Sequence, residues 1–247
     1  MKPFVIAYIY PELLNLYGDT GNVTALSRRL EWRNIPVEVR HIHVEENIDF
    51  SEIDILYLGG GGDHEQEIAN TKLAQYKDDL KLFASQGGVI FAACGGYHML
   101  GNSFCLNGNI VEGLGVVDIE TSCSKQRYVG NAWMYMKQQT LIGFVNHQTS
   151  TTYGADVTPL GYAFGPAYPH QKDACAEGVA VKNVFGTNFH GPLLPRNPKF
   201  TDYILKRALG QRGESQELLE LQGDELEEKA AKYLWDRFDM SRYSQTK

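Results

Sequence analysis

The apolar residues of the first third of the chain fall into short continuous runs. Such runs occur at 4–10, 53–58 and 88–93, and residues 36–44 alternate β-branched with polar side chains. Short apolar runs bounded by glycine or polar residues are typical of buried strands. The pattern therefore predicts four strands before residue 94.

Helical spacing separates these predicted strands. Val23, Leu26 and Leu30 recur at intervals of three and four, so they indicate one apolar helix face, and Asp19 or Thr20 is in place to cap that helix. A second, highly charged amphipathic stretch follows residue 62. Strands that alternate with helices predict a parallel sheet covered by helices on both faces.

Helical spacing disappears in the middle of the chain. Strand-like pieces occupy 114–120, 132–137, 141–145, 178–181 and 184–189. We expect them to form an antiparallel or mixed extension of the same sheet. A helix is predicted from Pro198 to about Leu209, and an acidic helical stretch from about 214 to 238. We therefore expect one domain, 1–247, with an α/β core at about 1–210 and a helical segment at about 211–247.

Composition excludes several classes of function. The 247 residues carry a formal net charge of -7 and no Lys/Arg cluster, which argues against nucleic acid as the main partner. No apolar run approaches the roughly 18 residues of a membrane span, so we expect no membrane insertion. Residues 1–10 lack a small-residue cleavage site and fit a buried strand better than a signal peptide.

The four cysteines form no C-x-x-C pair and no regular framework; they are Cys94, Cys105, Cys123 and Cys175. This usage predicts reduced thiols in a cytoplasmic protein, without zinc or disulfides.

The strongest chemical signal is VIFAACGGYHML at 89–100. A buried strand ends on Cys94, two glycines permit a sharp turn, and a short helix begins, as in a nucleophile elbow. The Gly95 N–H is placed to donate to an oxyanion, and the helix N-terminus is expected to lower the pKa of the thiol. The alternative is that Cys94 is a small core residue.

A second glycine cluster, 59–62, ends the preceding predicted strand. Neighbouring parallel strands end at the same edge of a sheet, where open α/β proteins bind ligands. Gly60 and Gly61 are therefore candidates for a second oxyanion donor, although four glycines can also form a simple flexible loop. No phosphate-loop motif is present, which disfavours nucleotide binding.

A cysteine nucleophile needs a base, and the sequence has seven histidines: His41, His43, His64, His98, His147, His170 and His190. His98 lies one helical turn beyond Cys94. His147 and His190 each follow a predicted strand. The residues alone do not choose between these last two.

Three motifs together resemble the class I glutamine amidotransferases: LGGGGD at 58–63, CGGY at 94–97 and GTNFHGP at 186–192. The resemblance implies a flavodoxin-like three-layer α/β sandwich, with a mostly parallel central sheet extended by antiparallel strands and with C-terminal helices. It also implies that Cys94 is the nucleophile and His190 the base. In the triad branch a glutamate stands two residues after that histidine; here it is Pro192. A Cys–His dyad is implied, as in the cobyric acid synthase-like branch.

Further segments are similar to the glutaminase subunits of lipid II isoglutaminyl synthase; they lie at 14–22, 112–115, 190–197 and 201–205. That resemblance implies that Arg127 holds the α-carboxylate of L-glutamine, a role that suits a guanidinium. Without the resemblance, Arg127 would be taken for a surface residue.

Two positions depart from the family pattern. His98 stands where a substrate-positioning glutamine is usual, and 146–150 lacks the glycines expected after a histidine. Two other readings therefore stay open: hydrolysis of another γ-glutamyl substrate, or a non-catalytic regulatory subunit.

The resemblance also implies a partner. No cofactor or metal is expected in this chain, because it has neither a phosphate loop nor the length for an ATP-binding half. ATP and Mg²⁺ are expected on a separate Mur-ligase-like synthetase that uses the ammonia to amidate D-glutamate of lipid II. A heterodimer of the two chains is implied.

Overall fold

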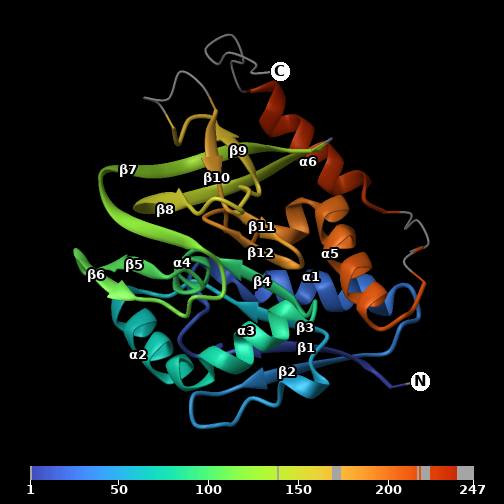
Figure 1. Cartoon of the computed structure of the whole chain (residues 1–247). Coiled ribbons are helices and arrows are strands. Elements are labelled where there is room, and N and C mark those ends of the chain that lie inside the picture. The colour runs from blue at the N-terminus through green and yellow to red at the C-terminus, as the bar shows by residue number, and fades with distance from the viewer. Residues whose placement is uncertain (1, 138, 169–173, 216, 218–222, 238–247) are drawn as a thin grey trace.

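The computed structural model describes residues 2–137, 139–168, 174–215, 217 and 223–237. Within them the strands form two sheets of six, one above the other in Figure 1. We call them sheet A, which contains the first strands of the chain, and sheet B, which contains the middle strands.

Sheet A has the order β11-β12-β4-β3-β1-β2. Its strands are β1 (Phe4–Ile9), β2 (Val37–Ile42), β3 (Ile55–Leu58), β4 (Val89–Ala93), β11 (Val179–Val181) and β12 (Val184–Thr187). All neighbours are parallel except β11 and β12. Strands β1, β3, β4 and β12 are buried along their whole length, which explains their continuous apolar sequences. The predicted mostly parallel sheet is confirmed.

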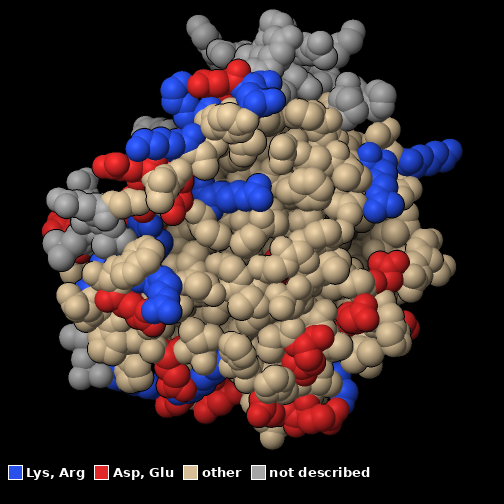
Figure 2. Space-filling model, turned by 180° about the vertical axis from the view of Figure 1, so that it is seen from behind, with Lys and Arg blue, Asp and Glu red and all other residues tan. Residues whose placement is uncertain are grey.

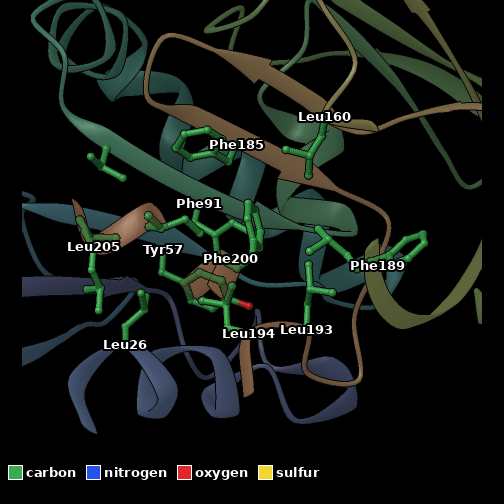
Figure 3. Packing of buried hydrophobic residues seen from close by; sticks show 14 of the residues in the cluster. Leu26, Tyr57, Phe91, Leu160, Phe185, Phe189, Leu193, Leu194, Phe200 and Leu205 are labelled. Atoms are coloured by element: carbon green, nitrogen blue, oxygen red, sulfur yellow. The ribbon is translucent and has the colours of Figure 1, made fainter. Parts of the chain in front are cut away.

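Helices cover both faces of sheet A (Figure 1). Helices α1 (Thr20–Glu31) and α5 (Pro198–Gln211) pack on one face, and α2 (Asp63–Leu73) and α3 (Lys77–Ser85) on the other. Figure 3 shows the first of these layers, where Phe200 of α5 packs against Phe91 of β4 and Leu26 of α1 belongs to the same apolar cluster. The α/β layering predicted from the alternating pattern is therefore confirmed.

Sheet B is a separate sheet with the order β10-β9-β7-β5-β6, and β8 pairs with β7. Its strands are β5 (Ser103–Leu106), β6 (Asn109–Glu112), β7 (Ile119–Met136), β8 (Gln139–Tyr153), β9 (Gly161–Phe164) and β10 (Cys175–Glu177). The expectation that the middle strands extend the first sheet holds for β11 and β12, which correspond to the predicted strands 178–181 and 184–189, and is wrong for the strands before them. The reason is that β7 and β8 pair with each other as a long antiparallel hairpin instead of adding to an edge of sheet A.

Two further helices complete the described chain. Helix α4 (Gly95–Met99) follows β4 directly, and α6 (Glu225–Asp236) lies beside sheet B. Ala231, Leu234 and Trp235 of α6 pack against apolar residues of that sheet. Helix α6 is shorter than the predicted stretch, part of which, including Leu218 and Leu221, lies outside the described residues.

The surface and the helices bear on the predicted class of protein. No helix in the described ranges is long and apolar enough to cross a membrane. On the face shown in Figure 2, most acidic and basic side chains lie toward the edges, and the centre is largely uncharged. Charge is therefore not gathered into one basic surface on that face.

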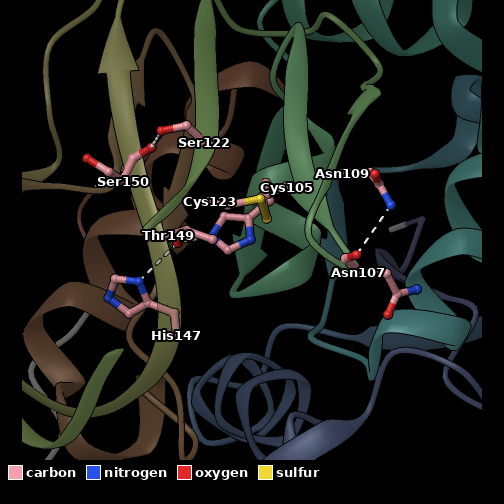
Figure 4. The surroundings of a disulfide bond; sticks show 9 residues. Cys105, Asn107, Asn109, Ser122, Cys123, His147, Thr149 and Ser150 are labelled. Atoms are coloured by element: carbon pink, nitrogen blue, oxygen red, sulfur yellow. Dashed lines mark hydrogen bonds between the residues drawn. A yellow bond between two sulfur atoms is a disulfide. The ribbon is translucent and has the colours of Figure 1, made fainter. Parts of the chain in front are cut away.

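A disulfide joins Cys105 of β5 to Cys123 of β7 (Figure 4). The expectation of four reduced thiols is therefore wrong for this pair, whereas Cys94 and Cys175 are free. The parallel pairing of β5 with β7 brings the two Cα atoms to 5.1 Å, although 18 positions separate them in the sequence. That proximity depends on strand pairing, which cysteine spacing does not reveal.

Candidate functional site

The strand-to-helix turn at Cys94 is confirmed. Cys94 lies between β4 and α4 with φ 51° and ψ -117°, a sparsely populated conformation for a residue with a side chain. Its N–H donates to the Thr187 carbonyl at the end of β12, at 2.7 Å. A Cβ on Gly96 would lie 2.6 Å from the carbonyl oxygens of Leu58 and Gly59, so this turn requires glycine. Such a turn holds its side chain in a fixed position, as a nucleophile elbow does.

The thiol of Cys94 is not activated in the way the sequence suggests. Burial, together with the negative charge of Asp19, raises the pKa of Cys94 to about 12. A hydrogen bond from the Gly95 backbone acts in the opposite direction but is weaker. The expected lowering of the thiol pKa is therefore wrong, because burial and the negative charge of Asp19 both oppose ionisation of the thiol.

The predicted glycine loop does lie against the cysteine. A Cβ on Gly60 would be 3.1 Å from the Cβ of Cys94 and 3.7 Å from its sulfur. The Gly60 N–H, however, donates to Asp19 Oδ2 at 2.8 Å, and the Gly61 carbonyl accepts from Gln66 Nε2 at 2.7 Å. The loop thus lies against Cys94, but the Asp19 carboxylate occupies the Gly60 N–H.

Asp19 contacts the glycine loop beside Cys94, whereas its position in the sequence predicted a helix cap. It precedes α1, yet its side chain makes no cap hydrogen bond; the Thr20 N–H donates to Asn15 Oδ1 instead. The carboxylate is fully buried and also accepts from the Tyr57 hydroxyl at 3.2 Å. Burial raises the pKa of Asp19 to about 7, against the hydrogen bonds from Gly60 and Tyr57. Its ionisation therefore falls in the physiological range.

His190 is held at the junction of the two sheets. It follows β12, whose Thr187 is paired with Ala93 next to Cys94. Its backbone forms an antiparallel bridge with Phe144 of β8, with N–H to oxygen distances of 2.9 and 3.2 Å. Burial, together with the positive charge of Arg196, lowers the pKa of His190 to about 4. The imidazole is therefore neutral at pH 7 and can accept a proton.

The other two candidate histidines have partners. His98 is buried, and its Nε2 lies 2.7 Å from Asn188 Oδ1. His147 Nδ1 lies 3.0 Å from the Thr149 hydroxyl, beside the disulfide in Figure 4. Burial lowers the pKa of His98 to about 4 and, with the charges of His98 and His190, that of His147 to about 3.

The two nitrogens of His190, by contrast, have no hydrogen-bond partner within the described part of the chain. This difference favours His190 as the base. His170 lies outside the described residues.

Arg127 is linked to His190 through two other side chains. It lies on the exposed part of β7, and its Nε and Nη2 donate to Asn146 Oδ1 on β8 at 3.2 and 2.9 Å. The Asn146 amide in turn donates to the Tyr17 hydroxyl, and the Tyr17 ring lies on the imidazole of His190. Tyr17 and Asn146 were missed by the sequence reasoning, because neither stands in a chemical motif.

Glu177 was also missed. It is buried and accepts from the Thr187 hydroxyl at 3.1 and 3.2 Å and from the Asn188 N–H at 2.6 Å. Burial raises the pKa of Glu177 to about 7. This carboxyl fixes the chain that leads from β12 to His190. The sequence signal for Glu177 is a single acidic residue within the otherwise apolar segment 175–181.

The donors of the site do not form a metal centre. In the described residues, no three His, Cys, Asp or Glu side chains are grouped so that they could hold a metal ion.

Comparisons with known proteins agree with this geometry. Residues 5–198 match the model of the CobB/CobQ-like glutamine amidotransferase domain. The chain is 36% identical to the lipid II isoglutaminyl synthase (glutamine-hydrolyzing) subunit GatD of Staphylococcus aureus, over 99% of this chain and 100% of the relative. It is 34% identical to the Streptococcus pneumoniae subunit of the same name, over 84% and 81%.

Solved structures support the fold. A glutamine amidotransferase crystal structure superposes with a TM-score of 0.55 and 16% identity, covering 82% of this chain and 98% of the other. One from Thermotoga maritima gives 0.54 and 15%, covering 95% and 94%.

Proposed function

This chain belongs to the CobB/CobQ-like glutamine amidotransferase family, and on that premise we propose that it is the glutaminase subunit of a lipid II isoglutaminyl synthase. In this proposal it hydrolyses L-glutamine to glutamate and ammonia through a dyad of Cys94 and His190. The observation that carries the proposal is the strained turn at Cys94, bonded to the end of the strand that leads to His190.

The reaction is acyl transfer. The Cys94 sulfur attacks the side-chain amide carbon of glutamine while the thiol proton passes to His190. The Gly95 N–H faces the sulfur and is the first oxyanion donor. The protonated imidazole gives its proton to the departing nitrogen, the C–N bond breaks, and ammonia leaves a thioester. Water, deprotonated by His190, then attacks the thioester, the C–S bond breaks, and glutamate and the thiol are restored.

Gly60 joins the oxyanion site only when its N–H leaves Asp19. Because the pKa of Asp19 is raised to about 7, the carboxyl takes up a proton close to neutral pH. The neutral acid is a weaker acceptor, so protonation favours release of the Gly60 N–H. Gly61 extends the same loop, and Arg127 and His98 are proposed to contact the substrate.

A partner fits the chemistry of the dyad. The pKa of Cys94 is raised to about 12 and that of His190 is lowered to about 4, so the isolated chain holds a neutral thiol and a neutral imidazole. An acid from another subunit, placed beside His190, would stabilise the imidazolium that forms during the reaction. We therefore propose weak glutaminase activity for the isolated chain and stronger activity in a heterodimer.

The partner that we propose is a Mur-ligase-like synthetase, MurT. It would bind ATP and Mg²⁺ and use the ammonia to amidate D-glutamate of lipid II, while this chain would carry no cofactor of its own. We place the complex in the cytoplasm, where glutamine and ATP are available. The Cys105–Cys123 bond is the feature that argues against a reducing compartment, so cell fractionation tests this point.

The experiment is purification of the chain alone and co-expressed with the ligase, followed by ammonia release from glutamine and amidation of lipid II. We expect one co-eluting complex whose ammonia release exceeds that of the chain alone. Labelling with 6-diazo-5-oxo-norleucine, mapped by mass spectrometry, should modify Cys94. No labelling and no ammonia release from the complex would leave the regulatory-subunit reading in its place.

A second candidate function is hydrolysis of another γ-glutamyl substrate. It is favoured by His98, whose buried ring is engaged by Asn188 at a position where the family usually carries glutamine. A panel of γ-glutamyl peptides assayed beside glutamine decides between the two. The second function requires a peptide with a higher kcat/KM than glutamine.

A further inference from the structure

Among the described residues, no side-chain hydrogen bond orients the imidazole of His190. Both ring nitrogens are buried and lack a hydrogen-bond partner within the described part of the chain, and the in-chain acid of a triad is replaced by Pro192. The bridge to Phe144 fixes only the backbone. A base in an acyl transfer must point at the nucleophile, so another contact has to hold the ring.

An aromatic side chain makes that contact. The ring of Tyr17 is stacked on the imidazole of His190, with centroids 4.3 Å apart and planes at 15°. Phe144 approaches the same imidazole at 5.6 Å and 59°. The His190 ring therefore contacts two aromatic side chains, and of these two Tyr17 is the one nearly parallel to it.

Tyr17 adopts a strained backbone conformation in this position. Its φ is +64°, a left-handed conformation that residues with side chains rarely adopt. The preceding Leu16 N–H donates to the Gly60 carbonyl at 2.9 Å, which ties the segment to the glycine loop beside Cys94. Strained residues of this kind concentrate at functional sites, where the surrounding structure imposes them.

A chain of hydrogen bonds links this tyrosine to the proposed substrate-binding arginine. The Tyr17 hydroxyl accepts from the Asn146 amide, and Asn146 Oδ1 accepts two bonds from the Arg127 guanidinium. Tyr17 is 42% exposed, whereas His190 is fully buried, so Tyr17 is the solvent-facing member of the stack. A carboxylate that pairs with Arg127 competes directly with Asn146 Oδ1.

We propose that Tyr17 is the positioning residue for His190, and that Asn146 couples it to the binding of the glutamine α-carboxylate at Arg127. The stack sets the plane of the imidazole in place of the glutamate that the triad branch carries two residues after the histidine. The hydrogen-bond chain holds Arg127 in place before substrate arrives. This inference rests on the proposed glutaminase function.

The test uses the complex with the co-expressed ligase and compares Tyr17→Leu with Tyr17→Phe. Tyr17→Leu removes the stack, and we expect kcat to fall about tenfold or more, within the range that a positioned acid–base supplies. Tyr17→Phe keeps the stack and loses the hydroxyl, so kcat should stay within about twofold. Tyr162→Leu, which removes another half-exposed tyrosine, is the matched control and should change neither kcat nor the KM for glutamine.

The coupling is tested by a double-mutant cycle in KM. Tyr17→Phe and Asn146→Ala break the same chain, so each should raise the KM for glutamine about two- to fivefold, and the double variant should match the single ones. Additive effects would overturn the coupling through Asn146.

One readout does not depend on catalysis. Removal of the Tyr17 ring admits water to the imidazole, so the pKa of His190, followed by NMR of its ring, should rise in Tyr17→Leu at unchanged Tm. An unchanged pKa together with an unchanged kcat would overturn the positioning role. Absence of glutaminase activity in the unmutated complex would instead refute the proposed function.

Discussion

In sheet A, β4 and β12 are buried along their whole length, whereas in sheet B the central part of β7 alternates between exposed and half-buried residues and β8 mixes buried, half-buried and exposed ones. The two sheets contribute to the site accordingly. Sheet A supplies Cys94 and the glycine loop through backbone geometry that tolerates no added side chain. Sheet B carries Arg127 and Asn146, for which we propose a role in substrate binding through their polar side chains.

The difference suggests a division between chemistry and recognition. A nucleophile needs a fixed position, and the carboxyl ends of packed parallel strands provide one. Recognition of a substrate tolerates adjustment, and exposed strand residues allow it. His190 is held by both sheets, because it follows β12 of sheet A and its backbone pairs with Phe144 of β8 in sheet B.

The largest effect is expected on the sheet A side, from Cys94→Ala. Loss of the nucleophile should lower glutamine hydrolysis by at least about 1,000-fold, because the covalent step has no substitute. Circular dichroism should show an intact fold, since the change removes one sulfur atom. The matched control is Cys175→Ala, the other free thiol, which should hydrolyse glutamine normally. If Cys94→Ala and Cys175→Ala lost similar glutaminase activity, the assignment of Cys94 as the nucleophile would be refuted.

The second-largest effect is expected from opening the disulfide of sheet B. Opening Cys105–Cys123, which closes a loop of 18 positions, should destabilise the fold by about 3 kcal/mol in the loop-entropy model. Amide hydrogen exchange with and without dithiothreitol should speed up in β5 and β7 and change little in β3 and β4. The double variant Cys105→Ser/Cys123→Ser is the control, because reductant should not affect it further. Equal acceleration in both sheets would mean that they unfold as one unit.

Arg127→Ala tests the recognition side. Loss of a charged hydrogen-bonding partner for the glutamine carboxylate should lower kcat/KM about 10- to 100-fold, mainly through KM. Steady-state kinetics over a range of glutamine concentrations separates the two constants. Arg28→Ala, which removes an exposed arginine paired with Glu31 on α1, should leave both unchanged. A loss confined to kcat would move Arg127 from recognition to chemistry.

The smallest effect concerns the charge beside the nucleophile. Above about pH 7 Asp19 is ionised, and its charge helps to raise the pKa of Cys94. Asp19→Asn should therefore lower the thiol pKa by about 0.5 to 1 and speed alkylation by iodoacetamide about three- to tenfold at pH 8.

The direction of this effect with pH is itself a check. Below pH 7 the native Asp19 is already protonated, so the rates of the two proteins should converge. Asp63→Asn, at the start of α2, is the control and should follow the native rate at every pH. A constant ratio of rates from pH 5 to 9 would exclude ionisation of Asp19 as the cause.

Parts of the site could be predicted because their signals are local. The run 89–96 contains its own explanation: a buried strand, a cysteine and two glycines, of which Gly96 must be glycine because two carbonyls face it. His190 was harder. It and His147 both stand on or after a strand, and only the family resemblance preferred His190. The structure supplies the physical difference, because Thr149 engages His147 and both nitrogens of His190 lack a partner in the described residues.

Other features had no local signal. The Cys105–Cys123 bond depends on parallel pairing of two short segments, and the second sheet depends on β7 choosing β8 as its partner. Asp19 carries a capping signal that was misleading, since its carboxylate turns to Gly60. The pKa of Cys94 was predicted in the wrong direction, because the burial of a thiol is a property of everything packed around it.

The sequence by itself determined the parallel sheet of alternating strands and helices, the turn at Cys94 and the glycine loop one strand away, because these follow from periodicity and from the backbone freedom of glycine. Only the tertiary structure decided the second sheet, the disulfide, the contact of Asp19 with Gly60 and the stack of Tyr17 on His190. Each of these joins residues far apart in the chain, and their pairing is set by packing and burial of the whole domain, which a linear pattern does not encode.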